Sequence, residues 1–150
     1  MTSTLKALLS QTRPVQRLVA ADTGSADRGP AVLAEVIGRG NLVILPRTTG
    51  YGEAVGEALR HPAATMEVPE TADLPLDDRI EWIWLLHDDS APAPTALQQL
   101  LAVADDNPHV GILGPKLRDW YDQRMLLELG ITMDAAGRRD TGIDRREFDQ

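Results

Sequence analysis

The sequence predicts an α/β domain built around a mainly parallel sheet. Short apolar runs with strand character alternate with segments of helical spacing as far as residue 113, and glycine, proline and aspartate separate them. Such alternation is typical of folds in which each helix returns the chain to the next parallel strand. The length of 150 residues suits one domain.

The helices are predicted from the spacing of leucine and from residues that start or end a helix. Leu97, Leu100 and Leu101 share one face of a helix over 94–104, and Pro30 suits a first helical turn. The expected helices cover residues 4–11, 30–37, 50–59 and 94–104. The stretch 61–78 is rich in proline and acid, and we expect a surface excursion there.

The strands are predicted from apolar runs that stop at turn-forming residues. The strongest run, 80–86 (IEWIWLL), has no polar face, so we expect it to be the central strand, buried on both sides. The other expected strands cover residues 15–21, 41–45 and 110–113. Residues 126–133 are expected to be extended, with a hairpin turn at 134–137 and a loop-like charged tail after it.

The composition excludes several classes of function. The net charge of −8 argues against general nucleic-acid binding, which needs a basic surface, although a metal ion can still allow a nucleotide to bind. The absence of cysteine excludes disulfides and thiolate-bound zinc. No apolar run approaches the roughly 18 residues of a membrane span. We therefore expect a cytosolic domain, or the cytosolic part of a larger protein.

Acidic side chains follow two of the predicted strands. The strand 15–21 runs into Asp22, and the strand 80–86 runs into His87, Asp88 and Asp89. Ligands of parallel sheets bind at the carboxyl ends of the strands, so these acids are expected to face one cleft. Magnesium often binds one or two carboxylates together with substrate phosphates, which makes Asp88 and Asp89 candidates for a metal site.

Each acidic motif also has a plain structural interpretation. Asp88 and Asp89 precede proline and fit a solvated loop equally well. Asp22 opens a run of glycine and serine that readily forms turns, and Asp27 can cap the helix that follows. A single histidine such as His87 is more often a surface or structural residue than a ligand.

A glycine-rich helix start allows a further interpretation. Gly50, Gly52 and Gly56 nearly match the dinucleotide-binding fingerprint, but the third glycine comes one residue late. The acid that should end a second strand falls instead in a proline-rich stretch around Glu70. A dinucleotide-binding oxidoreductase is therefore the less favoured alternative, and close packing of a helix through small residues is the plain one.

Taken in order, these pieces resemble the family 2 glycosyltransferases, which are inverting enzymes with a GT-A fold, the Rossmann-like fold of nucleotide-diphospho-sugar transferases. A helix ending in glutamine and a strand lead into an Asp-x-Gly-Ser-x-Asp turn at 22–27. A Gly-aromatic-Gly helix start follows at 50–52, and then the acidic motif at 87–89. Pro-x-Ala-Leu-x-x-Leu at 94–100 and Val-Gly-Ile-x-Gly-Pro-Lys at 110–116 extend the resemblance over nearly the whole chain.

The resemblance implies roles for the residues that match the family's motifs. Asp22 matches the acid that contacts the nucleoside base, and Asp88 matches the middle acid of the metal motif, so both are implied to be nucleotide-binding. Asp89 matches the last acid of that motif and is the implied ligand of Mn²⁺ or Mg²⁺. His87 occupies a position where the family often has Asp or Asn, and Thr48 one where Asn is common. The resemblance therefore implies no role for either residue.

The implied reaction moves a sugar from a nucleotide-diphosphate sugar to a polysaccharide or glycolipid acceptor, with metal assistance. The similarity is to actinobacterial enzymes of cell-wall and polysaccharide biosynthesis. A non-catalytic nucleotide-binding or interaction module is the alternative, favoured by His87 and by the lack of a secure general base. Asp122, Glu128 and Asp134 are the candidate bases, and each fits equally well as a surface residue.

The family's usual first strand and its distal base motif have no counterpart in these residues. We therefore expect 1–150 to be a partial GT-A domain, the nucleotide-sugar-binding half, truncated at both ends. A positioned base contributes about 100- to 10,000-fold in rate, so we expect the chain alone to transfer no sugar. The expected location is the cytoplasm, including the inner face of the cell membrane, with no membrane span within the chain itself.

Overall fold

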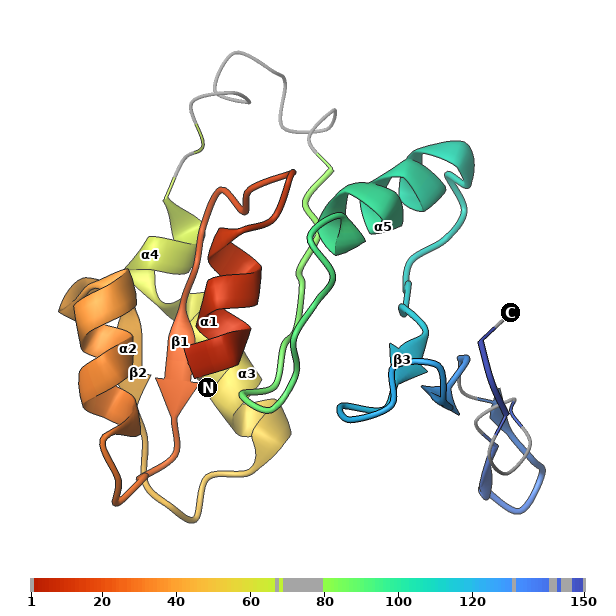
Figure 1. Ribbon diagram of the computed structural model, residues 1–150. Coiled ribbons are helices and arrows are strands. Elements are labelled where there is room, and N and C mark those ends of the chain that lie inside the picture. The colour runs from red at the N-terminus through yellow and green to blue at the C-terminus, as the bar shows by residue number, and fades with distance from the viewer. Residues whose placement is uncertain are drawn as a thin grey trace. The chain divides into compact units, whose positions relative to one another are not determined.

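The computed structural model describes residues 2–66, 68, 80–130, 132–140, 143 and 147–149. The chain divides into two compact units, Met1–Pro94 and Thr95–Gln150 (Figure 1). The first unit contains α1 (Thr2–Leu9), β1 (Ala20–Asp22), α2 (Gly29–Ile37), the 3-10 helix η1 (Arg39–Asn41), β2 (Leu42–Ile44), α3 (Tyr51–Arg60) and α4 (Pro62–Thr65). The second contains α5 (Ala96–Asp106), β3 (Leu117–Arg118), β4 (Leu126–Glu128), β5 (Thr132–Met133) and β6 (Arg139–Asp140).

The first unit is organised around a parallel pair of strands. β1 pairs with β2 in parallel, with Ala20 opposite Leu42 and Asp22 opposite Ile44, and α2 makes the crossover between the strands. α3 contacts β1, and α2 contacts β2. This strand–helix–strand arrangement confirms the predicted α/β class with parallel pairing, and it aligns the carboxyl ends of both strands.

Local signals explain where the helices of this unit begin and end. Asp27 accepts a hydrogen bond through Oδ1 from the backbone N–H of Gly29 at 2.8 Å at the start of α2, although the N-cap position itself is occupied by Arg28. Pro30 lies in the first turn, and α2 ends at Gly38, whose φ of 85° falls in the region that favours glycine. Leu5 and Leu8 of α1 are buried, whereas Leu9 is 63% exposed.

The prediction of a central strand over residues 80–86 is wrong. The structure forms no strand over residues 80–87, and Ile80 at their start is 83% exposed. Side chains of the first part of the chain hold this segment instead. Arg17 forms an ion pair with Glu81 within the segment, and beyond its end Gln11 donates from Nε2 to the carbonyl oxygen of Ala93 at 2.7 Å. An apolar run favours burial, but a strand also needs a neighbour with free backbone groups, and the parallel pair of β1 and β2 does not include this segment.

Two other predicted strands also differ from the structure. Residues 110–116 form no strand, and Ile112 among them is 92% exposed. Of the expected strand 15–21, only its last two residues belong to β1, which extends to Asp22. The strand 41–45 is confirmed as β2, one residue shorter at each end. Apolar character alone predicts the location of a strand poorly where its pairing partner is unknown.

The second unit consists of one helix followed by two antiparallel strand pairs. α5 confirms the predicted helix 94–104, shifted by two residues at both ends, and it buries Leu97 and Ala104. β3 pairs with β4, and β5 pairs with β6. The turn between β5 and β6 confirms the predicted hairpin, because the N–H of Asp134 donates to the carbonyl oxygen of Arg138 at 3.0 Å.

The charged tail is more regular than predicted. Arg139 and Asp140 form β6, and Phe148 makes an isolated antiparallel bridge with Met125. The expected surface excursion 61–78 begins with the short helix α4, and most of the rest of it lies outside the described residues. Among the described helices, none is long and apolar enough to cross a membrane.

Candidate functional site at the strand ends of the first unit

Asp22 ends β1 with a buried carboxylate. Its exposed fraction is 7%, and its Oδ2 accepts hydrogen bonds from the backbone N–H groups of Gly24 and Ser25, both at 3.1 Å. The carbonyl oxygen of Asp22 accepts from the N–H of Leu45 at 2.8 Å, which continues the ladder beyond β2. These bonds confirm the predicted turn and hold the carboxylate rigidly at the end of the strand.

Gly24 brings the loop after β1 against the loop after β2. Its φ is +76°, and a Cβ placed on it would lie 3.1 Å from the backbone nitrogen of Arg47 and 3.3 Å from its Cα. A side chain at position 24 would therefore strain the backbone and press on Arg47. The contact brings an arginine close to the Asp22 turn.

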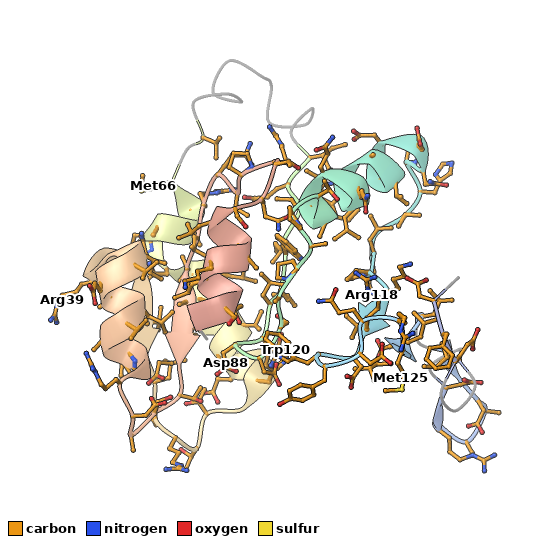
Figure 2. All side chains as sticks on the ribbon, viewed as in Figure 1. Arg39, Met66, Asp88, Arg118, Trp120 and Met125 are labelled. Carbon is orange, nitrogen blue, oxygen red and sulfur yellow. The ribbon has the colours of Figure 1, made fainter. Side chains whose placement is uncertain are left out.

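The acidic motif forms a compact turn rather than the end of a strand. The carbonyl oxygen of His87 accepts from both the N–H of Ser90 at 3.3 Å and its Oγ at 2.7 Å. Asp88 and Asp89 lie within this turn and are exposed; Figure 2 labels Asp88. We call residues 87–90 the acidic turn.

Two long-range contacts hold the acidic turn against the starts of two helices. The buried Thr4 of α1 donates from Oγ1 to the carbonyl oxygen of Asp88 at 2.6 Å. The rings of Tyr51, at the start of α3, and His87 are stacked, with centroids 4.9 Å apart and planes 8° apart. The backbone of the turn is therefore positioned without the carboxylates of Asp88 and Asp89, which stay available to a ligand.

The elements that carry the predicted site residues lie toward the same end of the first unit. In Figure 1, β1 points to the end where the acidic turn lies and where α3 begins. The structure therefore brings the acidic turn, α1 and α3 together by direct contacts. That Asp22 and Asp89 face one cleft stays a prediction.

The donor groups of the acidic turn suit a hard divalent cation. Two adjacent carboxylates can bind Mn²⁺ or Mg²⁺ when substrate phosphates and water complete the coordination. Within the part of the chain that the structure describes, no group of three or more histidine, aspartate or glutamate residues could hold a metal by itself. The residues present therefore fit a metal ion that is bound partly by these carboxylates and partly by the phosphates of a nucleotide.

The family comparison decides how these features are interpreted. The model of the Glycosyl transferase family 2 matches residues 1–124, which include Asp22 and the acidic turn. The chain belongs to this family. This family 2 glycosyltransferase therefore has a GT-A type of α/β fold, of which the parallel pair of β1 and β2 forms a small part. Its general activity is glycosyl transfer from a nucleotide sugar to an acceptor. No curated protein and no solved structure matches the chain significantly.

The three candidate bases of this glycosyltransferase all lie in the second unit. Hydrogen bonding to Arg124 lowers the pKa of Asp122, and hydrogen bonds from Arg138 lower the pKa of Asp134. A general base works best with a pKa near the operating pH, so both shifts run in the wrong direction for that role. Glu128 lies half-buried on β4. The geometry favours the surface interpretation for Asp122 and Asp134.

Thr4 also belongs to the candidate site, although the sequence alone did not identify it. Its hydrogen bond reaches a residue 84 positions away, and no local pattern indicates such a contact.

We expect Thr4→Val to lower the free energy of unfolding by about 0.5–1.5 kcal/mol, since it removes one hydrogen bond while keeping the shape of the side chain. Urea denaturation followed by tryptophan fluorescence measures this loss. Thr4→Ser keeps the hydroxyl and should lose less, and an equal loss in both variants would show that the bond to Asp88 does not matter.

Proposed function

We propose that the first unit binds the nucleotide-diphosphate sugar at its strand ends, and that the sugar passes to a polysaccharide or glycolipid acceptor with inversion. The observation that carries the proposal is the acidic turn, which presents two exposed carboxylates on a backbone held by Thr4 and by the Tyr51–His87 stack. A charged group on a positioned backbone binds a ligand without first having to order itself.

Each residue of the proposed site has a distinct task. The rigid Asp22 would contact the nucleoside, because its carboxylate lies at the carboxyl end of β1. Asp88 would orient the nucleotide, and Asp89 would hold Mn²⁺ or Mg²⁺ beside the diphosphate. When bound, the metal supplies positive charge that neutralises the leaving diphosphate. Arg47, whose backbone lies beside Gly24 of the Asp22 turn, would add a further positive charge near the nucleotide.

The wider role proposed here follows the family and the resemblance to polysaccharide enzymes. We propose that the chain is the nucleotide-sugar-binding half of a GT-A domain that works in cell-wall or polysaccharide biosynthesis. The proposed location is the cytoplasm, at the inner face of the membrane, because nucleotide sugars and a glycolipid acceptor meet there. The second candidate is a non-catalytic nucleotide-binding module, which the histidine at position 87 of the acidic turn favours.

A titration separates these functions. Isothermal calorimetry with UDP, GDP and dTDP, each with and without Mn²⁺, should show binding of at least one nucleotide that depends on the metal. A folded protein that binds none of them in either condition would be a module without a donor site. Binding of NAD(H) without metal would instead support an oxidoreductase.

A further inference from the structure

A contact between two rings joins the acidic turn to the start of α3. The rings of Tyr51 and His87 lie nearly parallel, with an angle of 8° between their planes and centroids 4.9 Å apart. A separation of this size between parallel rings is typical of offset stacking, which attracts the rings beyond the area that they bury. The stack therefore favours one position of His87, and with it one position of the acidic turn.

The backbone that carries Tyr51 is itself well fixed. The N–H of Ala54 donates to the carbonyl oxygen of Gly50 at 2.9 Å, which closes the first turn of α3 around Tyr51. The N–H of Thr49 donates to the carbonyl oxygen of Pro46 at 2.9 Å, so the loop before the helix is also a closed turn. Ala54 is buried, and α3 packs on β1. Tyr51 therefore offers a fixed ring on which its partner can rest.

His87 connects the stack to the backbone of the acidic turn. Its carbonyl oxygen accepts hydrogen bonds from both the N–H and the Oγ of Ser90, so the residue that stacks on Tyr51 also closes the turn. The next carbonyl oxygen, that of Asp88, accepts from Thr4 of α1. Two different helices therefore hold two adjacent residues of the turn, which restricts its orientation as well as its position.

The loop that carries Tyr51 also touches the Asp22 turn. A Cβ placed on Gly24 would lie 3.1 Å from the backbone nitrogen of Arg47, which lies in the loop between β2 and α3. This one loop therefore contacts the Asp22 turn near its start and leads into Tyr51 at its end. Through the ring of His87, it connects the two turns that carry the candidate donor-site carboxylates.

We propose that Tyr51 is a positioning residue of the donor site, which holds the acidic turn through the ring of His87. The proposal rests on the proposed function, because a positioned turn matters only if it binds the nucleotide and its metal. A turn that is already ordered binds its ligand with a smaller loss of entropy. In this role His87 contributes the face of its ring and no nitrogen ligand, so a histidine at this position is compatible with a working donor site.

Variants of the ring pair separate these roles. Tyr51→Leu removes the ring but keeps an apolar side chain that favours helices, and it should weaken Mn²⁺-dependent nucleotide binding about three- to tenfold. His87→Asn keeps a polar group without a ring and should lose about as much. Tyr51→Phe and His87→Phe both keep the stack, and both should bind as the wild type does. Calorimetric titration of the whole chain with UDP, GDP and dTDP in Mn²⁺ measures these affinities.

The double variant shows whether the two rings act through each other. Tyr51→Leu/His87→Asn should lose no more affinity than either single change, because each one already removes the stack. Ala54→Gly weakens the same helix but leaves both rings in place, so it is the control for a general loss of stability and should bind normally.

NMR relaxation reports the order of the acidic turn without any ligand. The order parameters of the backbone amides of residues 87–90 should fall in Tyr51→Leu and stay at the wild-type level in Tyr51→Phe and Ala54→Gly. This measurement distinguishes a failure of the positioning role from a failure of the donor function. Absent nucleotide binding by the wild type, with a turn that loosens only when the ring is lost, would reject the donor function and confirm that Tyr51 holds the turn.

Three outcomes would overturn the proposal. Unchanged order parameters in Tyr51→Leu would show that the stack does not hold the turn. Nucleotide affinity that is equal in Tyr51→Leu and the wild type would show that the order of the turn does not matter for binding. Loss of binding in His87→Phe would identify an imidazole nitrogen, and not the stacked ring, as the group that the site needs.

Discussion

Asp89→Ala should abolish metal-dependent nucleotide binding, with a loss of affinity of at least about 100-fold in the presence of Mn²⁺. Even residues that act indirectly on a metal cost about 10- to 100-fold when removed, and a direct ligand should cost more. The acidic turn is held through the carbonyl oxygen of Asp88 and the ring of His87, so the variant loses a carboxylate without losing the turn. Calorimetric titration with UDP, with and without Mn²⁺, measures the effect.

The matched control is Asp105→Ala. Asp105 is an exposed aspartate near the end of α5, where an acid is an ordinary solvated residue. Its removal changes the net charge of the chain by the same amount and should leave UDP affinity unchanged. If the two variants bind UDP equally well in Mn²⁺, Asp89 is not a metal ligand.

Gly24→Ala should lower the free energy of unfolding by at least about 2 kcal/mol and weaken nucleotide binding. A left-handed backbone conformation costs a residue with a Cβ about 1–2 kcal/mol. The added Cβ would also lie 3.1 Å from the backbone nitrogen of Arg47, which is closer than an ordinary van der Waals contact, so the loop after β2 must move. Urea denaturation measures the first effect, and UDP titration measures the second.

Gly137→Ala separates the two causes of that loss. Gly137 has the same φ of +76°, but nothing lies within 4 Å of a Cβ placed there. It should therefore lose only the conformational part, about 1 kcal/mol, with no change in UDP affinity. Equal losses of stability in the two variants, with normal UDP binding by both, would show that the close approach of Gly24 and Arg47 contributes neither to stability nor to nucleotide binding.

The helices and turns of this glycosyltransferase could be predicted because their causes are local. α2 and α3 follow from proline, glycine and small residues close in sequence, and the Asp22 turn forms from bonds to the next two or three residues. Backbone bonds of a helix span four residues, so a short window of sequence contains both partners. The order of the motifs along the chain predicted the family, which the match over residues 1–124 confirms.

The structure around the acidic turn could not be predicted from local sequence patterns. The apolar run 80–86 predicted a buried strand, whereas the structure leaves it irregular and exposes Ile80. The acidic turn that follows this run contacts α1 and the start of α3, which lie far away in the sequence, through the hydrogen bond from Thr4 to Asp88 and the stacking of Tyr51 on His87. No pattern within the run itself names those partners.

The sequence by itself determined the α/β class, the approximate positions of α1, α2, α3 and α5, the Asp22 turn and the family. Only the tertiary structure decided that Thr4 and Tyr51 hold the acidic turn, that Gly24 lies against Arg47, and that hydrogen bonds to Asp119 fix the loop between β3 and β4. The first group depends on interactions between residues a few positions apart. The long-range contacts of the second group form only when folding brings distant groups together. The short loop between β3 and β4 closes through hydrogen bonds whose geometry is not specified by its residue types alone.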